Sequence, residues 1–149
     1  MVLNEFGKIA YKEWEETDKI RKNCALHEFI IMPNHIHGII EIIFQNKTSN
    51  NSENIGKFKS PSQTIGSIIR GYKIAAIKKI KEEILNNSGG CTGELQFAPT
   101  ALKIIQLDYK IWQRNYHEHI IRNDNAFQNI SKYIKNNPKK WEEKKLNKK

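Results

Sequence analysis

The stretch that decides the fold is ALHEFIIMPNHIHGIIE, which occupies residues 25–41. Both halves are rich in isoleucine and the first contains Phe29, and such β-branched and aromatic residues favour strands. The Pro33-Asn34 pair between the halves is typical of a turn. The stretch therefore predicts two strands joined by a tight turn.

A pair of histidines follows the predicted turn. Side chains two residues apart on a strand point to the same side, so His35 and His37 are expected to face together while Ile36 enters the core. Two imidazoles placed in this way can hold one divalent cation. Because a His-x-His sequence also arises by chance, the alternative is a pair of surface histidines on a half-buried strand.

Helices and loops are expected on both sides of this hairpin. Apolar residues recur at helical spacing over residues 3–22, with Asn4 as a candidate N-cap. Polar residues 45–60 predict a mobile loop. A helix should begin at Ser60-Pro61, where Pro suits the first helical position, and continue to about Leu85. Residues 86–93 predict another loop.

The C-terminal third predicts a strand followed by a helix. Residues 104–121 favour a strand, although their pattern is ambiguous. Asn123 or Asp124 could cap a last helix, which Pro138 should end or kink. Together these elements predict an α+β fold, in which a small antiparallel sheet is flanked by helices.

Composition and charge narrow the class of protein. The 149 residues suit a single domain, and the net charge of +9 favours an anionic partner such as nucleic acid, a membrane surface or an acidic protein. The sequence lacks an apolar run long enough to span a bilayer and a signal-peptide pattern, so we expect a cytoplasmic protein. Lysines concentrate at the end of the chain, and we expect a basic, partly disordered tail from about residue 139.

Tyr133 and Asn137 form a second feature in the segment SKYIKNNP. Residues four apart share one face of a helix, so a phenol and an amide lie side by side. The amide oxygen could be a third metal ligand, and the phenol could be a nucleophile that attacks a phosphodiester. Taken singly, Asn137 could be a polar residue at a helix end and Tyr133 an amphipathic side chain at the rim of the core.

The two features resemble one known family. MPNHIHGII is similar to the His-hydrophobic-His motif of the single-tyrosine transposases of bacterial insertion sequences, and IWQRNYHEHIIRND followed by YIKNNP is similar to the second block of the REP-associated tyrosine transposases. The resemblance implies a ferredoxin-like domain in which His35, His37 and Asn137 bind Mg²⁺ or Mn²⁺. Tyr133 would be the nucleophile that nicks DNA and transfers the strand through a 5′-phosphotyrosine.

The resemblance also implies a partner and contains one departure. The substrate would be single-stranded DNA with a hairpin or REP-like element, acted on at the nucleoid, with a homodimer as one arrangement. Family members usually begin with a further strand ahead of the first helix, which this sequence lacks. That departure favours one alternative, an inactive domain that binds DNA hairpins. A second alternative is a nickase of the replication-initiator or relaxase kind, which shares the chemistry but not the YI..NP block.

Other residues have weaker claims to function. Tyr116 is the rival nucleophile, and His117-Glu118-His119 is a second His-x-His sequence for which a structural or DNA-contact role is expected. Cys24 and Cys91 are expected to be structural thiols. Four basic residues are candidates for phosphate contacts, with a solvated surface as the alternative for the first two: Arg70, Lys73, Arg114 and Arg122. Trp112 and Trp141 could stack on bases, but a place in the core or at its rim is the more common role of tryptophan.

Overall fold

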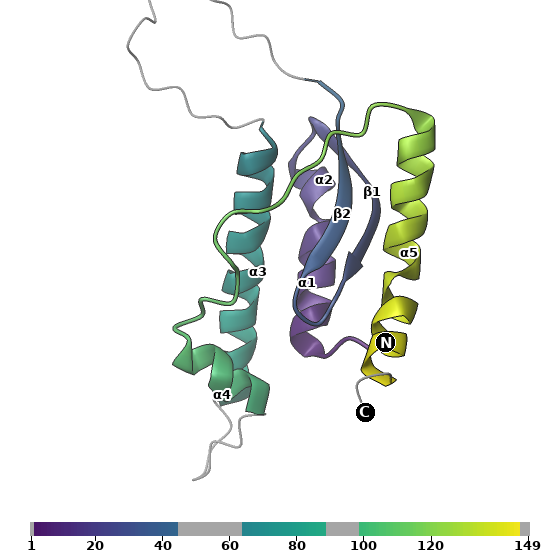
Figure 1. The fold of residues 1–149 in the computed structure, drawn as a ribbon. Helices are drawn as coiled ribbons and strands as arrows, with labels where there is room; N and C mark the ends of the chain where they lie inside the picture. The colour runs from purple at the N-terminus through teal and green to yellow at the C-terminus, as the bar shows by residue number, and fades with distance from the viewer. Residues whose placement is uncertain (1, 45–63, 89–98, 147–149) are drawn as a thin grey trace, which may run out of the picture.

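The computed structural model describes residues 2–44, 64–88 and 99–146. It has the expected α+β class, with a small antiparallel sheet flanked by helices (Figure 1). The expected loop at 45–60, the helix start at Ser60-Pro61 and Cys91 lie outside the described residues. The elements follow one another in the order α1 (Glu5–Glu15), α2 (Thr17–Ile20), β1 (Cys24–Ile31), β2 (Ile36–Ile42), α3 (Ile65–Ser88), α4 (Pro99–Gln106) and α5 (Asp124–Leu146).

The hairpin confirms the interpretation of residues 25–41. Strands β1 and β2 pair antiparallel, with Ile31 opposite Ile36 beside the turn and Cys24 opposite Ile42 at the far end. The N–H of Met32 donates to the carbonyl of His35 over 2.8 Å and closes the turn. The two strands form the whole sheet within the described part of the chain.

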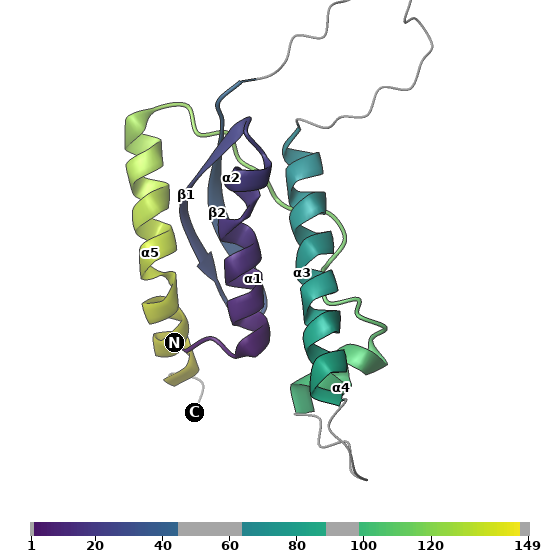
Figure 2. The ribbon, with the colours of Figure 1, turned by 180° about the vertical axis from the view of Figure 1, so that it is seen from behind.

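The hairpin lies between two helical layers. Helices α1 and α3 pack against each other on one side, and Figure 2 shows α1 lying across the strands. The core between them contains Trp14, Tyr72 and Ala76, against which Ile36 packs. Helix α5 packs on both strands from the other side, where Lys135 forms an ion pair with Glu28 of β1 at 2.8 Å. Each face of the hairpin is thus held by a different helix layer.

The first helical region is interrupted, although its cap is as expected. Asn4 accepts a hydrogen bond from the N–H of Gly7 and begins α1. The helix expected over 3–22 is divided at Glu16 into α1 and the single-turn α2. Helix α3 ends at Ser88, three residues later than expected.

The strand predicted over residues 104–121 is wrong. Pro99–Gln106 form α4, which packs on α3 through Ile80, Ile84, Ala101 and Ile104. The following residues, 107–123, cross from α4 over the sheet to α5 without regular structure (Figure 1). Asp108, Tyr109 and Asn115 have φ angles of 49°, 56° and 65°, and this left-handed backbone breaks the extended path that a strand requires. We call residues 107–123 the crossing segment.

Helix α5 is longer than expected. Its N-cap is Asn123, whose side chain accepts a hydrogen bond from the N–H of Ala126. The helix continues through Pro138 to Leu146, so Pro138 does not end it. The tail expected to be disordered from about residue 139 is therefore helical as far as Leu146, and residues 147–149 are not described.

Candidate active site

The histidine pair lies where the turn becomes strand β2. The rings of His35 and His37 are 4.7 Å apart between centroids and nearly perpendicular, at 81°. Ile36 points the other way and packs against the cluster around Trp14 and Tyr72. The prediction that the two imidazoles share one side of the strand is confirmed.

One hydrogen bond orients His35. Its Nδ1 lies 2.6 Å from the amide oxygen of Asn34. Because that oxygen only accepts, Nδ1 carries the proton and donates it, which leaves the lone pair on Nε2. A polar neighbour that fixes the tautomer in this way is typical of histidines that bind metals.

His37 has the protonation state that a metal ligand needs. Partial burial and, second, the charge of neighbouring His35 hold its pKa below the ordinary value of 6.5. Only the neutral imidazole can donate a lone pair to a cation. His37 is thus available as a ligand at neutral pH.

Tyr133 of α5 joins the histidine pair. Its ring centroid lies 5.4 Å from that of His37, with the rings at 78°. The residue is 47% exposed, whereas Ile134, its neighbour in the sequence, is 3% exposed and faces the core. An accessible phenol beside the imidazoles is the geometry that a nucleophile requires.

Asn137 lies one turn further along the same helix face. It is 8% exposed, so it is not a solvated residue at a helix end. Its Nδ2 is buried without a hydrogen-bond partner. A buried amide nitrogen that lacks a partner costs about 1–3 kcal/mol. As a donor it can serve only a hydrogen-bond acceptor, whereas a cation would be bound by the amide oxygen. Two rings on this face, those of Tyr133 and Trp141, contact His37 and His35 respectively, and Asn137 lies between them.

His35, His37 and Asn137 offer two imidazoles and one amide oxygen, which are donor types that a divalent cation accepts. Among the described residues, no three or more His, Cys, Asp or Glu side chains come together in a group that could hold a metal ion. A cation held by His35, His37 and Asn137 has only three protein ligands, so water or substrate oxygens would need to complete its coordination. Mg²⁺ prefers oxygen ligands throughout, whereas softer cations accept imidazole more readily. The donor set therefore favours Mn²⁺ over Mg²⁺.

An open groove gives access to this site. Its volume is about 1720 Å³, and His35, His37 and Tyr133 are among the residues that line it. The groove also reaches β2 and the crossing segment.

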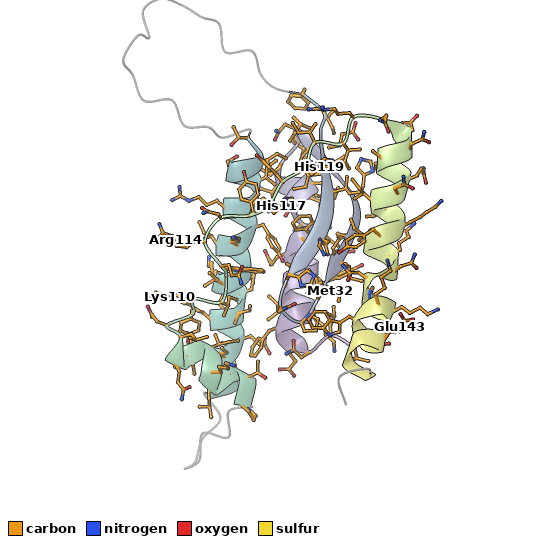
Figure 3. The ribbon with its side chains drawn as sticks, viewed as in Figure 1. Met32, Lys110, Arg114, His117, His119 and Glu143 are labelled. Carbon is orange, nitrogen blue, oxygen red and sulfur yellow. The ribbon has the colours of Figure 1, made fainter. Side chains whose placement is uncertain are left out.

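The rival residues lie elsewhere. Tyr116, His117 and His119 are exposed on the crossing segment, and Figure 3 shows the two histidines between α3 and the sheet, far along the hairpin from Met32 at its turn. Slight burial and then the Glu118 carboxylate raise the pKa of Tyr116, which disfavours the phenolate. Neither Tyr116 nor the pair of His117 and His119 lies beside the histidine pair at the turn.

The residues predicted to contact DNA divide into two groups. Arg70, Arg114 and Arg122 are exposed, and Arg122 lines a separate depression of about 420 Å³ with Glu118 and His119. Lys73 instead donates to two carbonyls of the crossing segment, at 2.9 and 2.8 Å. Lys73 therefore has a structural role that the sequence did not indicate.

The sequence did not predict that two further residues of α5, Lys140 and Trp141, lie at the candidate site. The sequence favours a core or rim position for Trp141, with base stacking as the alternative, and its ring lies 5.9 Å from that of His35. Lys140 places its ammonium 5.7 Å from the centroid of the Tyr133 ring. Their spacing of seven and eight residues from Tyr133 could have indicated them, had the helix been expected to continue through Pro138.

Comparison with known proteins identifies a relative. Family models and solved structures give no match. An uncharacterized protein of Haemophilus influenzae is 36% identical over 152 aligned positions, which cover 98% of this chain and 72% of the relative. Within the described residues, each helix is too short or too polar to cross a lipid bilayer. By the extent and identity of the match, the chain belongs to the same family as the Haemophilus protein.

Proposed function

We propose that this protein is a metal-dependent single-strand DNA endonuclease and strand transferase, of the kind found in the REP-associated tyrosine transposases. The observation that carries the proposal is the contact between the Tyr133 ring and the His37 ring. It joins a strand and a helix that are almost 100 residues apart in sequence. The two motifs that resemble the transposase family thus meet at one place, as a shared active site requires.

Tyr133 acts as the nucleophile in this proposal. Its phenolic oxygen gives up a proton to solvent and attacks the phosphorus of a phosphodiester in the DNA strand. A tyrosine–phosphate bond forms, the bond from phosphorus to the 3′ oxygen breaks, and the released 3′ oxygen takes up a proton. The products are a 5′-phosphotyrosine and a free 3′-OH. Because a phosphodiester is exchanged for another, a 3′-OH can reverse the step without ATP and join a new end.

His35, His37 and Asn137 would hold the cation. When bound, Mg²⁺ or Mn²⁺ withdraws charge from the phosphoryl oxygens and orients the phosphodiester. The protein's own contribution is to orient His35 and to keep His37 neutral. The Asn34 hydrogen bond and the lowered pKa of His37 serve that purpose.

Charge and access support a polynucleotide substrate. The chain has a net charge of +9, and Lys140 lies directly beside the Tyr133 ring. Exposed arginines Arg70, Arg114 and Arg122 can add phosphate contacts along the crossing segment and α3. The open groove that His35, His37 and Tyr133 line gives a single strand a path to the phenol.

A covalent trapping assay tests the proposal. The protein is incubated with a labelled single strand that carries a hairpin, in the presence of Mn²⁺, and separated on a denaturing gel. We expect a labelled adduct that Tyr133→Phe abolishes and that the matched variant Tyr116→Phe retains. An adduct lost in Tyr116→Phe and kept in Tyr133→Phe would refute the assignment of the nucleophile.

The assay also distinguishes the alternatives. Tight binding of the hairpin without an adduct would identify an inactive hairpin-binding domain. An adduct that forms equally well on strands without a hairpin would favour a nickase of the replication-initiator or relaxase kind.

A further inference from the structure

The turns of α5 beyond Pro138 extend the candidate site. Proline removes the N–H that would bond to the Ile134 carbonyl, and such a residue commonly ends a helix. Here the helix continues, and its next turn brings Lys140 and Trp141 onto the face that carries Tyr133 and Asn137. This part of the chain had been expected to be a solvated tail, and its position calls for a role.

His35 is less constrained by the sheet than His37. Strand β2 begins at Ile36, so His35 lies in the turn, ahead of the strand. Besides the ring of His37 in the same hairpin, at 4.7 Å, two contacts restrict its ring: the hydrogen bond from Nδ1 to Asn34, and the Trp141 ring, at 5.9 Å and a tilt of 59°. The first restrains one edge of the imidazole and the second restrains its rotation. Asn34 belongs to the same turn, so Trp141 is the anchor that comes from a separate element.

We propose that Trp141 is a positioning residue, which packs on His35 and holds its imidazole so that Nε2 faces the cation and the phosphodiester. This inference rests on the proposed function and adds a residue that the motifs did not assign. Partners of metal-binding histidines typically change metal affinity 10- to 100-fold when they are replaced. The indole also has a buried Nε1 without a hydrogen-bond partner, so its packing can be separated from its N–H by substitution.

The chain offers a matched control on the same helix. Phe127 of α5 makes a similar edge contact with a histidine, its ring centroid lying 5.3 Å from that of His27. His27 is not part of the candidate site, since it pairs with Glu41 over 2.7 Å. Phe127→Leu therefore removes an aromatic ring from a histidine and from α5 without touching the histidine pair at the turn.

The test compares Trp141→Leu, Trp141→Phe and Phe127→Leu in the full chain. Two quantities are measured: the NMR shift of the His35 Cε1 proton without metal, and the dissociation constant of Mn²⁺ alone by calorimetry. For Trp141→Leu we expect a moved His35 resonance and a dissociation constant raised about tenfold. Trp141→Phe should restore the affinity to within about threefold, because a ring remains, and Phe127→Leu should leave both quantities unchanged.

The outcomes separate this inference from the proposed function. Unchanged Mn²⁺ affinity in Trp141→Leu, or equal losses in Trp141→Leu and Phe127→Leu, would overturn the role of Trp141 while leaving the metal site in place. Loss of affinity in Trp141→Phe as large as in Trp141→Leu would also overturn it, since packing would not be the cause. A wild-type chain that fails to bind Mn²⁺ would overturn the metal site and with it the role of Trp141.

Discussion

Gly38→Ala should destabilise the protein and disturb the histidine pair. Gly38 follows His37 on β2, and a Cβ built there would lie 2.5 Å from Cζ2 of Trp14 and 3.1 and 3.2 Å from Cη2 and Cε2. Trp14 is 4% exposed and packs against Tyr72, so it has little room to move. The substitution therefore forces either the indole or the strand to shift.

The size of the effect follows from two opposing contributions. Overpacking of a core typically costs ~1–3 kcal/mol. Alanine in place of glycine returns ~0.5–1 kcal/mol, because glycine loses more backbone entropy on folding. We expect a net loss of about 1–2 kcal/mol of unfolding free energy, which lowers the Tm by roughly 2–8 °C in a chain of this size.

Urea unfolding followed by circular dichroism measures this loss, and a double mutant identifies its cause. The three closest atoms of Trp14 belong to the six-membered ring of the indole, so Trp14→Phe should relieve much of the clash. The penalty of Gly38→Ala should then fall by at least ~0.5 kcal/mol in the Trp14→Phe background. Gly66→Ala on α3 is the control, because its new methyl meets the hydroxyl end of Tyr116 at 3.3 Å and Oγ1 of Thr64 at an ordinary 3.8 Å. Strictly additive losses would refute the steric account.

Three further predictions concern α5, the histidine pair and the crossing segment. Asn123→Ala removes the side-chain cap of α5 and should lower the unfolding free energy by about 1 kcal/mol in urea titrations; a loss under about 0.3 kcal/mol would contradict the cap. Burial lowers the pKa of His37 in the folded state, so the stability that neutral His37 contributes is present above a pH of about 6.5 and is lost as the pH falls towards the lowered pKa. Thermal unfolding should therefore show a steeper acid loss in wild type than in His37→Gln, and parallel curves would argue against it. Lys73→Met frees the carbonyls of Gln113 and Asn115 and should speed amide hydrogen exchange across the crossing segment, whereas exchange as slow as in wild type would show that Lys73 does not hold the segment.

The hairpin, the helix caps and the shared orientation of His35 and His37 could be predicted, because each depends on residues that are close together in the sequence. The turn at Pro33-Asn34 and the alternation of His35 and His37 are set within a few residues. Asn4 needs only the first turn of its helix to act as a cap. In these cases the tertiary structure confirms what neighbouring residues already favoured.

The crossing segment could not be predicted, because distant contacts decide its path. Its alternating apolar residues suit a strand, yet left-handed backbone at Asp108, Tyr109 and Asn115 turns the chain away. The ammonium of Lys73, some 40 positions earlier in the sequence, accounts for two of its carbonyls. Strand propensity is weak compared with such tertiary interactions.

The contact between Trp141 and His35 was likewise beyond local patterns. It requires α5 to continue through Pro138, a residue that by itself favours a helix end. Packing of α5 on both strands supplies stabilisation that the missing hydrogen bond does not. Trp141 and His35 are far apart in the sequence, and no local pattern indicates that they make contact.

The meeting of His35, His37, Tyr133 and Asn137 around one cation is tested most directly by paramagnetic broadening. Mn²⁺ is titrated into the isotope-labelled protein, and the side-chain resonances of these four residues are followed by NMR. We predict selective broadening of all four at low Mn²⁺, while His27, His117 and His119 remain sharp. Broadening centred on His117 and His119, with Tyr133 unaffected, would contradict the account.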